Sequence, residues 1–134
     1  MPLVDLRSHS HLSTEFGRWQ PLNEPLSIDA FGVNAMVCDP GEEFEIGHDE
    51  RDTGQQEVYV VVSGLAEFTV GEQRLQAGPG VVVSAPDAHA WRSYRALEPE
   101  TRIVCLGAVP AEPAPYGEWI AEAAAGGSVA GHDA

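Results

Sequence analysis

The sequence contains few cationic side chains and no lysine. Its seven basic residues are all arginine, and 21 Asp plus Glu residues bring the formal net charge to −14. A field of that sign repels nucleic acids and anionic membranes, and no basic cluster offsets it locally. We therefore expect neither a nucleic-acid partner nor a membrane partner.

Long apolar runs and cysteine pairs are also missing. No stretch approaches the roughly 20 apolar residues of a membrane-spanning helix, and nothing after Met1 resembles a signal peptide, which predicts a cytoplasmic protein. Cys38 and Cys105 lie far apart, without CxxC spacing, in apolar strand-like runs. This pattern favours buried thiols over metal ligands or a disulfide. Nucleophile motifs such as GxSxG and phosphate-binding glycine loops do not occur either.

The length of 134 residues fits one domain, spanning 1–134. Residues 1–27 contain three prolines and no sustained period, which predicts an N-terminal arm. We expect a β-barrel over 28–109. The remainder, 110–134, reads as a proline-rich linker, a short helix over 116–125 that stops at two glycines, and a flexible tail.

Short apolar segments separated by turn residues fill the middle of the chain. Such segments predict β-strands, and without helices between them they favour an all-β antiparallel sandwich, barrel or jelly roll. The expected strands cover 31–38, 57–64, 65–70, 73–76, 81–85, 89–94 and 102–109.

Two segments carry recognisable motifs. In the first, Glu57 is followed after six residues by Gly64. In the second, "GPGVVVSAPDAHAWRS", Gly80 is followed by Pro86 and His89. Over roughly 31–109 the chain resembles the cupin superfamily, in its small, single-domain conserved-barrel form, and this resemblance implies a β-barrel fold.

The resemblance also implies a metal site, because the two cupin motifs together supply three His and one Glu as ligands. The first motif is degenerate here: Arg51 and Thr53 stand where the motif has His-x-His, and the nearest histidine is His48. The candidate ligands are therefore His48, Glu57 and His89, with Glu50 in reserve.

A two-His, one-carboxylate set suits iron, manganese, nickel or zinc. Alternatively, Glu57 forms a hydrogen bond with His89 or Tyr59 and no metal is bound. Both alternatives remain open, and Glu57, His89 and Tyr59 are candidate acids and bases for catalysis.

Strand periodicity indicates which side chains share a face. Glu57, Tyr59 and Val61 alternate with three valines, and the mixed face is expected to line the barrel interior. The same rule groups His89, Trp91 and Ser93, and Asn34 lies in mid-strand where its amide needs a partner. The expected ligand pocket comprises Asn34, Tyr59, Val61, Trp91 and Ser93.

Other polar groups are expected to be solvated. These are His9 and His11 in the arm, His132 in the tail, and the acidic run of Glu42, Glu43, Glu45, Asp49, Glu50 and Asp52, apart from the reserve role of Glu50.

The expected function is binding of a small molecule in the barrel, with a metal-dependent enzyme of dioxygenase or isomerase type as one form. The alternative is a metal-free ligand-binding or structural dimeric protein without catalytic activity. The His48 loop separates these hypotheses, because an inward fold favours the metal. Open sheet edges favour a homodimer, and the resemblance implies that residues 1–27 are exchanged between its subunits.

Overall fold

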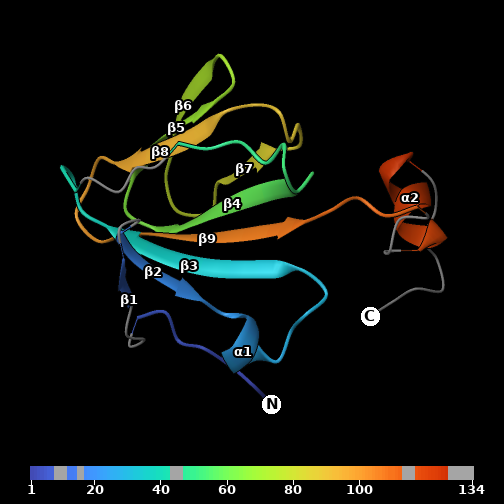
Figure 1. Ribbon diagram of the computed structural model, residues 1–134, viewed down its shortest axis with the longest axis horizontal. Helices are drawn as coiled ribbons and strands as arrows, with labels where there is room; N and C mark the ends of the chain where they lie inside the picture. Colours follow the sequence, from blue (N-terminus) through green and yellow to red (C-terminus); the bar gives the residue numbers. More distant parts are fainter. Residues whose placement is uncertain (8–11, 15–16, 43–46, 113–116, 127–134) are drawn as a thin grey trace.

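Two antiparallel β-sheets lie face to face (Figure 1). This architecture, an all-β antiparallel fold, is the one that the alternating apolar segments predict. The structure is a computed structural model, and it describes residues 1–7, 12–14, 17–42, 47–112 and 117–126.

The larger sheet has six strands in the order β1-β2-β3-β9-β4-β7. Its strands are β1 (Leu12–Thr14), β2 (Gly17–Pro21), β3 (Gly32–Cys38), β4 (Gln56–Ser63), β7 (Val82–Ala85) and β9 (Thr101–Ala108). β4 lies between β9 and β7, so its backbone is hydrogen-bonded on both sides. Glu57 lies opposite Gly107 on one neighbour and Ala85 on the other, which holds it well inside the sheet.

The smaller sheet has three strands in the order β6-β5-β8. They are β5 (Ala66–Val70), β6 (Gln73–Ala77) and β8 (Arg92–Ala96). In the register of β5 with β8, Phe68 lies opposite Tyr94 and Val70 lies opposite Arg92. Because side chains alternate along a strand, Arg92, Tyr94 and Ala96 share one face of β8.

The main core fills the space between the two sheets. Its buried residues come from both layers: Tyr59, Val61, Ala66, Phe68, Ala77, Val83, Ala85, Ile103 and Cys105. The rings of Tyr59, Phe68 and Tyr94 contact one another with centroids 5.5 to 6.1 Å apart. Cys38 and Cys105 are both buried thiols, as their apolar surroundings predict.

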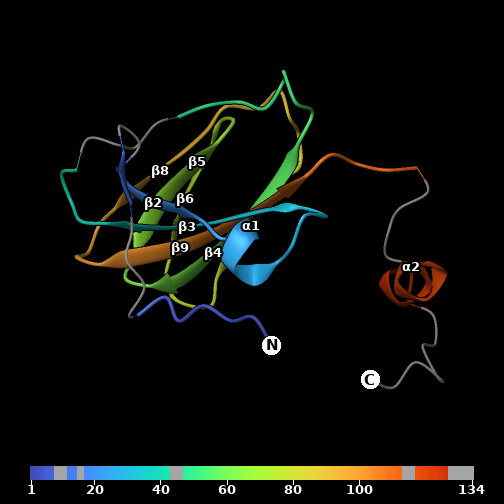
Figure 2. The same ribbon diagram turned by 60° about the horizontal axis from the view of Figure 1, so that its bottom comes forward.

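The outer face of the larger sheet is only partly covered. Over β3 and β9 it carries a second, smaller cluster in which Val4, Leu6, Leu22 and Leu26 pack around Val33 and Ala35. Leu22 directly precedes the short helix α1 (Asn23–Leu26) and Leu26 ends it, and the helix lies against this face (Figure 2). Over β4 and β7 the face stays open, and Val82 is 57% exposed.

The described parts of the predicted arm, 1–7, 12–14 and 17–27, thus lie on the sheet of their own chain, with β2 paired to β3. The exchange of this segment within a homodimer, and the homodimer itself, stay predictions. At the other end, helix α2 (Glu118–Ala124) falls within the predicted 116–125 and stands away from the sheets in both views (Figures 1 and 2). Among the described residues, no helix has the length and apolar character needed to cross a membrane.

Candidate functional site

Glu57 is the acidic residue at the centre of the site. It is 9% exposed and faces the space between the sheets, as the alternation along β4 predicts. Oε1 of its carboxylate accepts a hydrogen bond from the Tyr59 hydroxyl at 3.0 Å. Oε2 accepts one from the Cys105 thiol at 3.3 Å. A buried carboxylate is costly without such donors and without a cation.

Arg92 supplies the cation. Its Nη1 lies 3.0 Å from Glu57 Oε1, and the whole residue is 1% exposed. The remaining donors of the guanidinium bind backbone carbonyls: Nη2 donates to Asp87 at 2.7 Å and to Ala90 at 3.0 Å. The guanidinium is therefore fixed in place by the turn before β8.

His48 and Glu50 approach the same carboxylate from the loop before β4. His48 Nε2 lies 3.0 Å from Glu50 Oε1 and 3.4 Å from Glu57 Oε1. The backbones of His48 and Arg92 exchange two hydrogen bonds, at 2.8 and 2.9 Å, and the Glu50 N–H donates to the Ala88 carbonyl at 2.8 Å. These bonds fix the loop to the turn before β8, so His48 folds inward.

The residues that make this loop longer than the family motif form a turn of their own. The N–H groups of Thr53 and Gly54 both donate to the Glu50 carbonyl, and Gly54 has a φ of +76°. The Thr53 hydroxyl donates to Glu50 Oε2 at 2.7 Å. The extra residues of the loop lie in this turn, after Glu50. They therefore do not displace His48 from the mouth of the space between the sheets.

Burial and hydrogen bonding act in opposite directions on the pKa of Glu57. Burial by itself would raise it, but hydrogen bonds from His48, Arg92, Cys105 and Tyr59 outweigh burial and lower the pKa to about 2. Burial raises the pKa of both Tyr59 and Cys105, and the negative charge of Glu57 raises them further. Tyr59 and Cys105 therefore remain protonated and donate hydrogen bonds to Glu57. A tyrosine that stays protonated does not suit the role of a catalytic base.

The three side chains nearest the mouth have the spacing of metal ligands. One donor atom from each of His48, Glu50 and Glu57 lies within 4.8 Å of the others. Ligand atoms about 2.1 Å from a metal and about 90–110° apart are separated by about 3.0–3.4 Å. The distances of 3.0 and 3.4 Å from His48 Nε2 fall in this range. This group could hold a divalent ion. Glu50, the reserve ligand of the sequence analysis, belongs to it.

His89 is not brought to this group. The side chain of His89 is exposed in the turn between β7 and β8. The backbone N–H of His89 donates to the Asp87 carboxylate at 2.9 Å. We expected a strand over 89–94 with His89, Trp91 and Ser93 facing inward, and that expectation is wrong. β8 begins only at Arg92, and burial falls on Arg92 and Ala96, so the inward face has the opposite parity.

The expected pocket residues are therefore dispersed. Trp91 is 54% exposed and lies against the backbone of Gly47, where a Cβ would clash with the indole ring. Ser93 lies opposite Thr69 on the outer side of the small sheet. Tyr59 and Val61 are packed in the core, and Asn34, opposite Cys105, is half-buried on the inward face.

Arg92 is the functional residue that sequence reasoning missed. The sequence pattern indicates that a buried Glu57 needs a partner, and it predicts a metal ion, His89 or Tyr59 in that role. A chain whose only basic residue type is arginine offers a signal, because arginine is the usual partner in buried ion pairs. His9, His11, Glu43, Glu45 and His132 lie outside the described residues.

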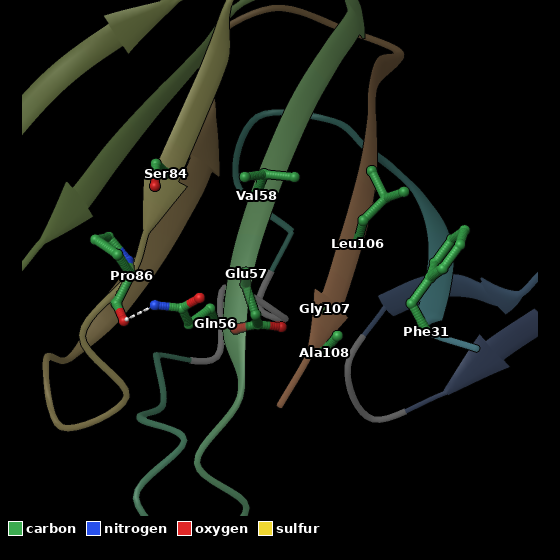
Figure 3. Close-up of a pocket in the computed structure, with 9 residues that line it drawn as sticks. All are labelled: Phe31, Gln56, Glu57, Val58, Ser84, Pro86, Leu106, Gly107 and Ala108. Carbon is green, nitrogen blue, oxygen red and sulfur yellow. Dashed lines mark hydrogen bonds between the residues drawn. The ribbon is translucent and has the colours of Figure 1, made fainter. Parts of the chain in front are cut away.

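A hollow of about 320 Å³ opens on the outer face of the larger sheet, and Glu57 is among the residues that line it (Figure 3). Phe31, Val58 and Leu106 give it apolar walls, and the Gln56 amide donates to the Pro86 carbonyl at its rim at 3.1 Å. Its volume lies at the lower end of the range for small-molecule pockets. It is a second place where a small ligand could be bound.

Comparisons with known proteins identify the fold. No protein-family model matches the sequence, and no curated protein matches it significantly. Among solved structures, a cupin protein from Bacteroides fragilis has a TM-score of 0.64 and 13% identity, covering 87% of this chain and 90% of that one. KdgF from Halomonas sp. has a TM-score of 0.63 and 20% identity, covering 81% and 94%.

A longer structure, described as a sugar phosphate isomerase from Acidithiobacillus ferrooxidans, has a TM-score of 0.55 and 22% identity. The alignment covers 67% of this chain and 57% of that protein. Two further neighbours, with TM-scores of 0.63 and 0.61, also carry the cupin name. Together with the two antiparallel sheets, these likenesses show that the chain has the cupin fold.

Proposed function

We propose that this protein holds one divalent cation on His48, Glu50 and Glu57 and binds a small, oxygen-bearing molecule beside it. The observation that carries the proposal is the convergence of three donor atoms on one point, with His48 Nε2 at 3.0 and 3.4 Å from the two carboxylates. The inward fold of the His48 loop, fixed by backbone hydrogen bonds to Ala88 and Arg92, supports it.

The donor set favours a particular class of ion. One imidazole and two carboxylates form a harder set than the histidine-rich sites that suit copper or zinc, so Mn²⁺ and Fe²⁺ are the preferred occupants. Side-chain exposure falls from 42% at His48 to 17% at Glu50 and 9% at Glu57. A small molecule would therefore reach the ion from the solvent side, next to His48.

Each residue has a distinct task. Glu57 provides a fixed carboxylate from the sheet, and its lowered pKa keeps it ionised at neutral pH. Glu50 is oriented by the Thr53 hydroxyl on Oε2, which turns Oε1 toward His48. When bound, a divalent ion would act as a Lewis acid that polarises an oxygen of the small molecule.

The test is a calorimetric titration of metal-free protein with Mn²⁺ and, separately, Zn²⁺. We expect one ion per chain. His48→Ala removes one of three ligands and Glu50→Gln removes the charge of another. Each should weaken binding by at least about tenfold, the smaller effect that loss of an outer-shell partner already has. His89→Ala is the matched control, since His89 is an exposed histidine outside the cluster, and it should bind like the wild type. Wild-type protein that binds neither ion, or equal weakening by His89→Ala, would overturn the proposal.

A metal-free binding protein is the second candidate, and the apolar hollow beside Phe31, Val58 and Leu106 favours it. There a small apolar ligand would be held by the walls of the larger sheet and oriented by the Gln56 amide. Titration of the wild type, His48→Ala and Glu50→Gln with a small apolar ligand separates the two candidates, because binding in this hollow requires neither His48 nor Glu50.

A further inference from the structure

The oxygen of Glu57 that would face a metal already carries two hydrogen bonds. Oε1 is the atom 3.4 Å from His48 Nε2, and it also accepts hydrogen bonds from Arg92 Nη1 and from the Tyr59 hydroxyl, each at 3.0 Å. A carboxylate oxygen offers about two lone-pair positions. A cation that uses this oxygen must therefore compete with one of the two donors.

The guanidinium of Arg92 cannot easily move away from Glu57 Oε1. Its side chain is fully buried, and Nε and Nη2 are held by the carbonyls of Asp87 and Ala90 at 2.7 to 3.2 Å. Its backbone forms the bridge with His48 that positions the candidate ligand itself. The guanidinium is thus built into the same local structure as the cluster.

Electrostatics makes the competition strong. A guanidinium keeps its charge at every accessible pH, and like charges within a few ångströms of each other repel strongly where burial limits screening by water, as it does at Glu57 and Arg92. Glu50 and Glu57 contribute two negative charges to the cluster, and Arg92 cancels one of them. The attraction available to a divalent ion is reduced accordingly.

We propose that the guanidinium of Arg92 is the cation that neutralises Glu57. Because it lies next to Oε1, it limits the affinity of the His48–Glu50–Glu57 cluster for divalent ions. The idea rests on the proposed metal site. It predicts that removing the charge of Arg92 strengthens metal binding, whereas a purely structural role predicts that any change at Arg92 weakens it by loosening His48.

The experiment compares Arg92→Gln with Arg92→Lys in the same Mn²⁺ and Zn²⁺ titrations. Arg92→Gln should bind about tenfold more tightly or better, because a full positive charge is removed beside the ion. Arg92→Lys keeps the charge but loses bonds of the guanidinium to the Asp87 and Ala90 carbonyls, so it should bind the ion no more tightly than the wild type. A folded Arg92→Gln protein whose affinity is unchanged or weaker overturns the inference. The thermal shift on adding Mn²⁺ gives a second readout, since tighter binding raises the melting temperature further.

Tyr59→Phe keeps the inference testable if Arg92→Gln does not fold. It frees one lone pair of Oε1 and changes no charge, and phenylalanine keeps the ring contacts with Phe68 and Tyr94. Affinity should rise by about two- to fivefold, because one neutral donor no longer competes. A fall in affinity would show that the donors on Oε1 assist metal binding, and it would overturn the inference.

The outcomes also separate this inference from the proposed function. Metal binding by the wild type, with no gain in Arg92→Gln or Tyr59→Phe, overturns the inference alone. Binding by Arg92→Gln but not by the wild type supports the inference and overturns the metal-binding function. In that case a variant carrying both Arg92→Gln and His48→Ala should no longer bind the ion. If this double variant still binds the ion, the tighter binding does not involve His48, and the inference is overturned. If no variant binds an ion, both ideas are overturned.

Discussion

The space between the two sheets has two unlike ends. At one end, Glu57 and Arg92 form a buried ion pair at 3.0 Å, with His48 and Glu50 at the mouth. At the other, Val61, Phe68 and Ile103 form a wholly apolar core with almost no exposure. Both ends share strand β4, since Glu57 and Val61 lie on one face of it only four residues apart.

The difference shows how one strand can supply both stability and a site. Burying apolar side chains stabilises the fold directly, while a buried ion pair contributes little net stability but becomes costly when one partner is lost. The apolar end should therefore respond to changes in side-chain volume, and the polar end to changes in charge and pH. Three experiments test this contrast.

The largest effect is expected at the apolar end. Phe68→Ala should lower the free energy of unfolding by about 3–5 kcal/mol, because it leaves a cavity beside the rings of Tyr59 and Tyr94. Urea denaturation measures the change. Val62→Ala is the control, since Val62 is 44% exposed on the outer face, and it should cost less than about 1 kcal/mol. Equal costs for the two variants would mean that this end is not the core of the fold.

At the polar end, Glu57→Gln should cost about 3 kcal/mol at pH 7, because it leaves the buried guanidinium of Arg92 without a charge partner. The pKa of Glu57 falls from 4.5 to about 2 on folding. A carboxyl with a depressed pKa stabilises the fold fully above its unfolded pKa, and this stabilisation is lost as the pH falls through its folded pKa. The difference between wild type and variant should therefore narrow between pH 5 and pH 2.

Denaturation at pH 7, 5 and 3 checks this prediction. Glu67→Gln is the matched control, because Glu67 pairs with the half-exposed Arg95 at 3.1 Å. An ion pair with such an exposed member is worth little, so this variant should cost less than about 1 kcal/mol. A gap between wild type and Glu57→Gln that stays constant across this pH range would contradict the depressed pKa.

The smallest effect concerns the turn that closes the apolar end between β4 and β5. Gly64 has a φ of +79°, and a Cβ there would lie 2.6 Å from the Thr101 Cα. Gly71, with a φ of +59°, has open space around it. Alanine at either position strains the backbone by about 1–2 kcal/mol, but only Gly64→Ala adds a clash. We expect it to cost at least about 1 kcal/mol more than Gly71→Ala in the same denaturation assay; similar costs would mean that Thr101 can move away.

Much of the fold was predictable because the strands of the core carry strong local signals. In β4 the alternation placed Glu57, Tyr59 and Val61 on the inward face, and the structure buries all three. β8 was predicted with the wrong parity, since "HAWRSY" reads equally well as a strand with Trp91 inside or with Arg92 inside. The backbone bonds that settle the parity join Arg92 to His48, 44 positions earlier in the chain.

The candidate site was predictable only in part. The sequence identified His48 and Glu57 and held Glu50 in reserve, because histidines and acids near a buried strand are recognisable as possible ligands. It could not exclude His89, whose exposure depends on where the turn after Pro86 ends. It also could not identify Arg92 as the cation of Glu57, because this contact spans 35 positions and two different sheets.

The sequence by itself determined that the chain forms an antiparallel β fold with a buried acid on one of its strands. Those features follow from local periodicity, turn residues and the cost of burying charge, each of which a short segment expresses. Only the tertiary structure decided which side chains meet that acid. Arg92, Tyr59, Cys105 and His48 come from different parts of the chain, and their convergence depends on the register and packing of the two sheets, which no single segment encodes.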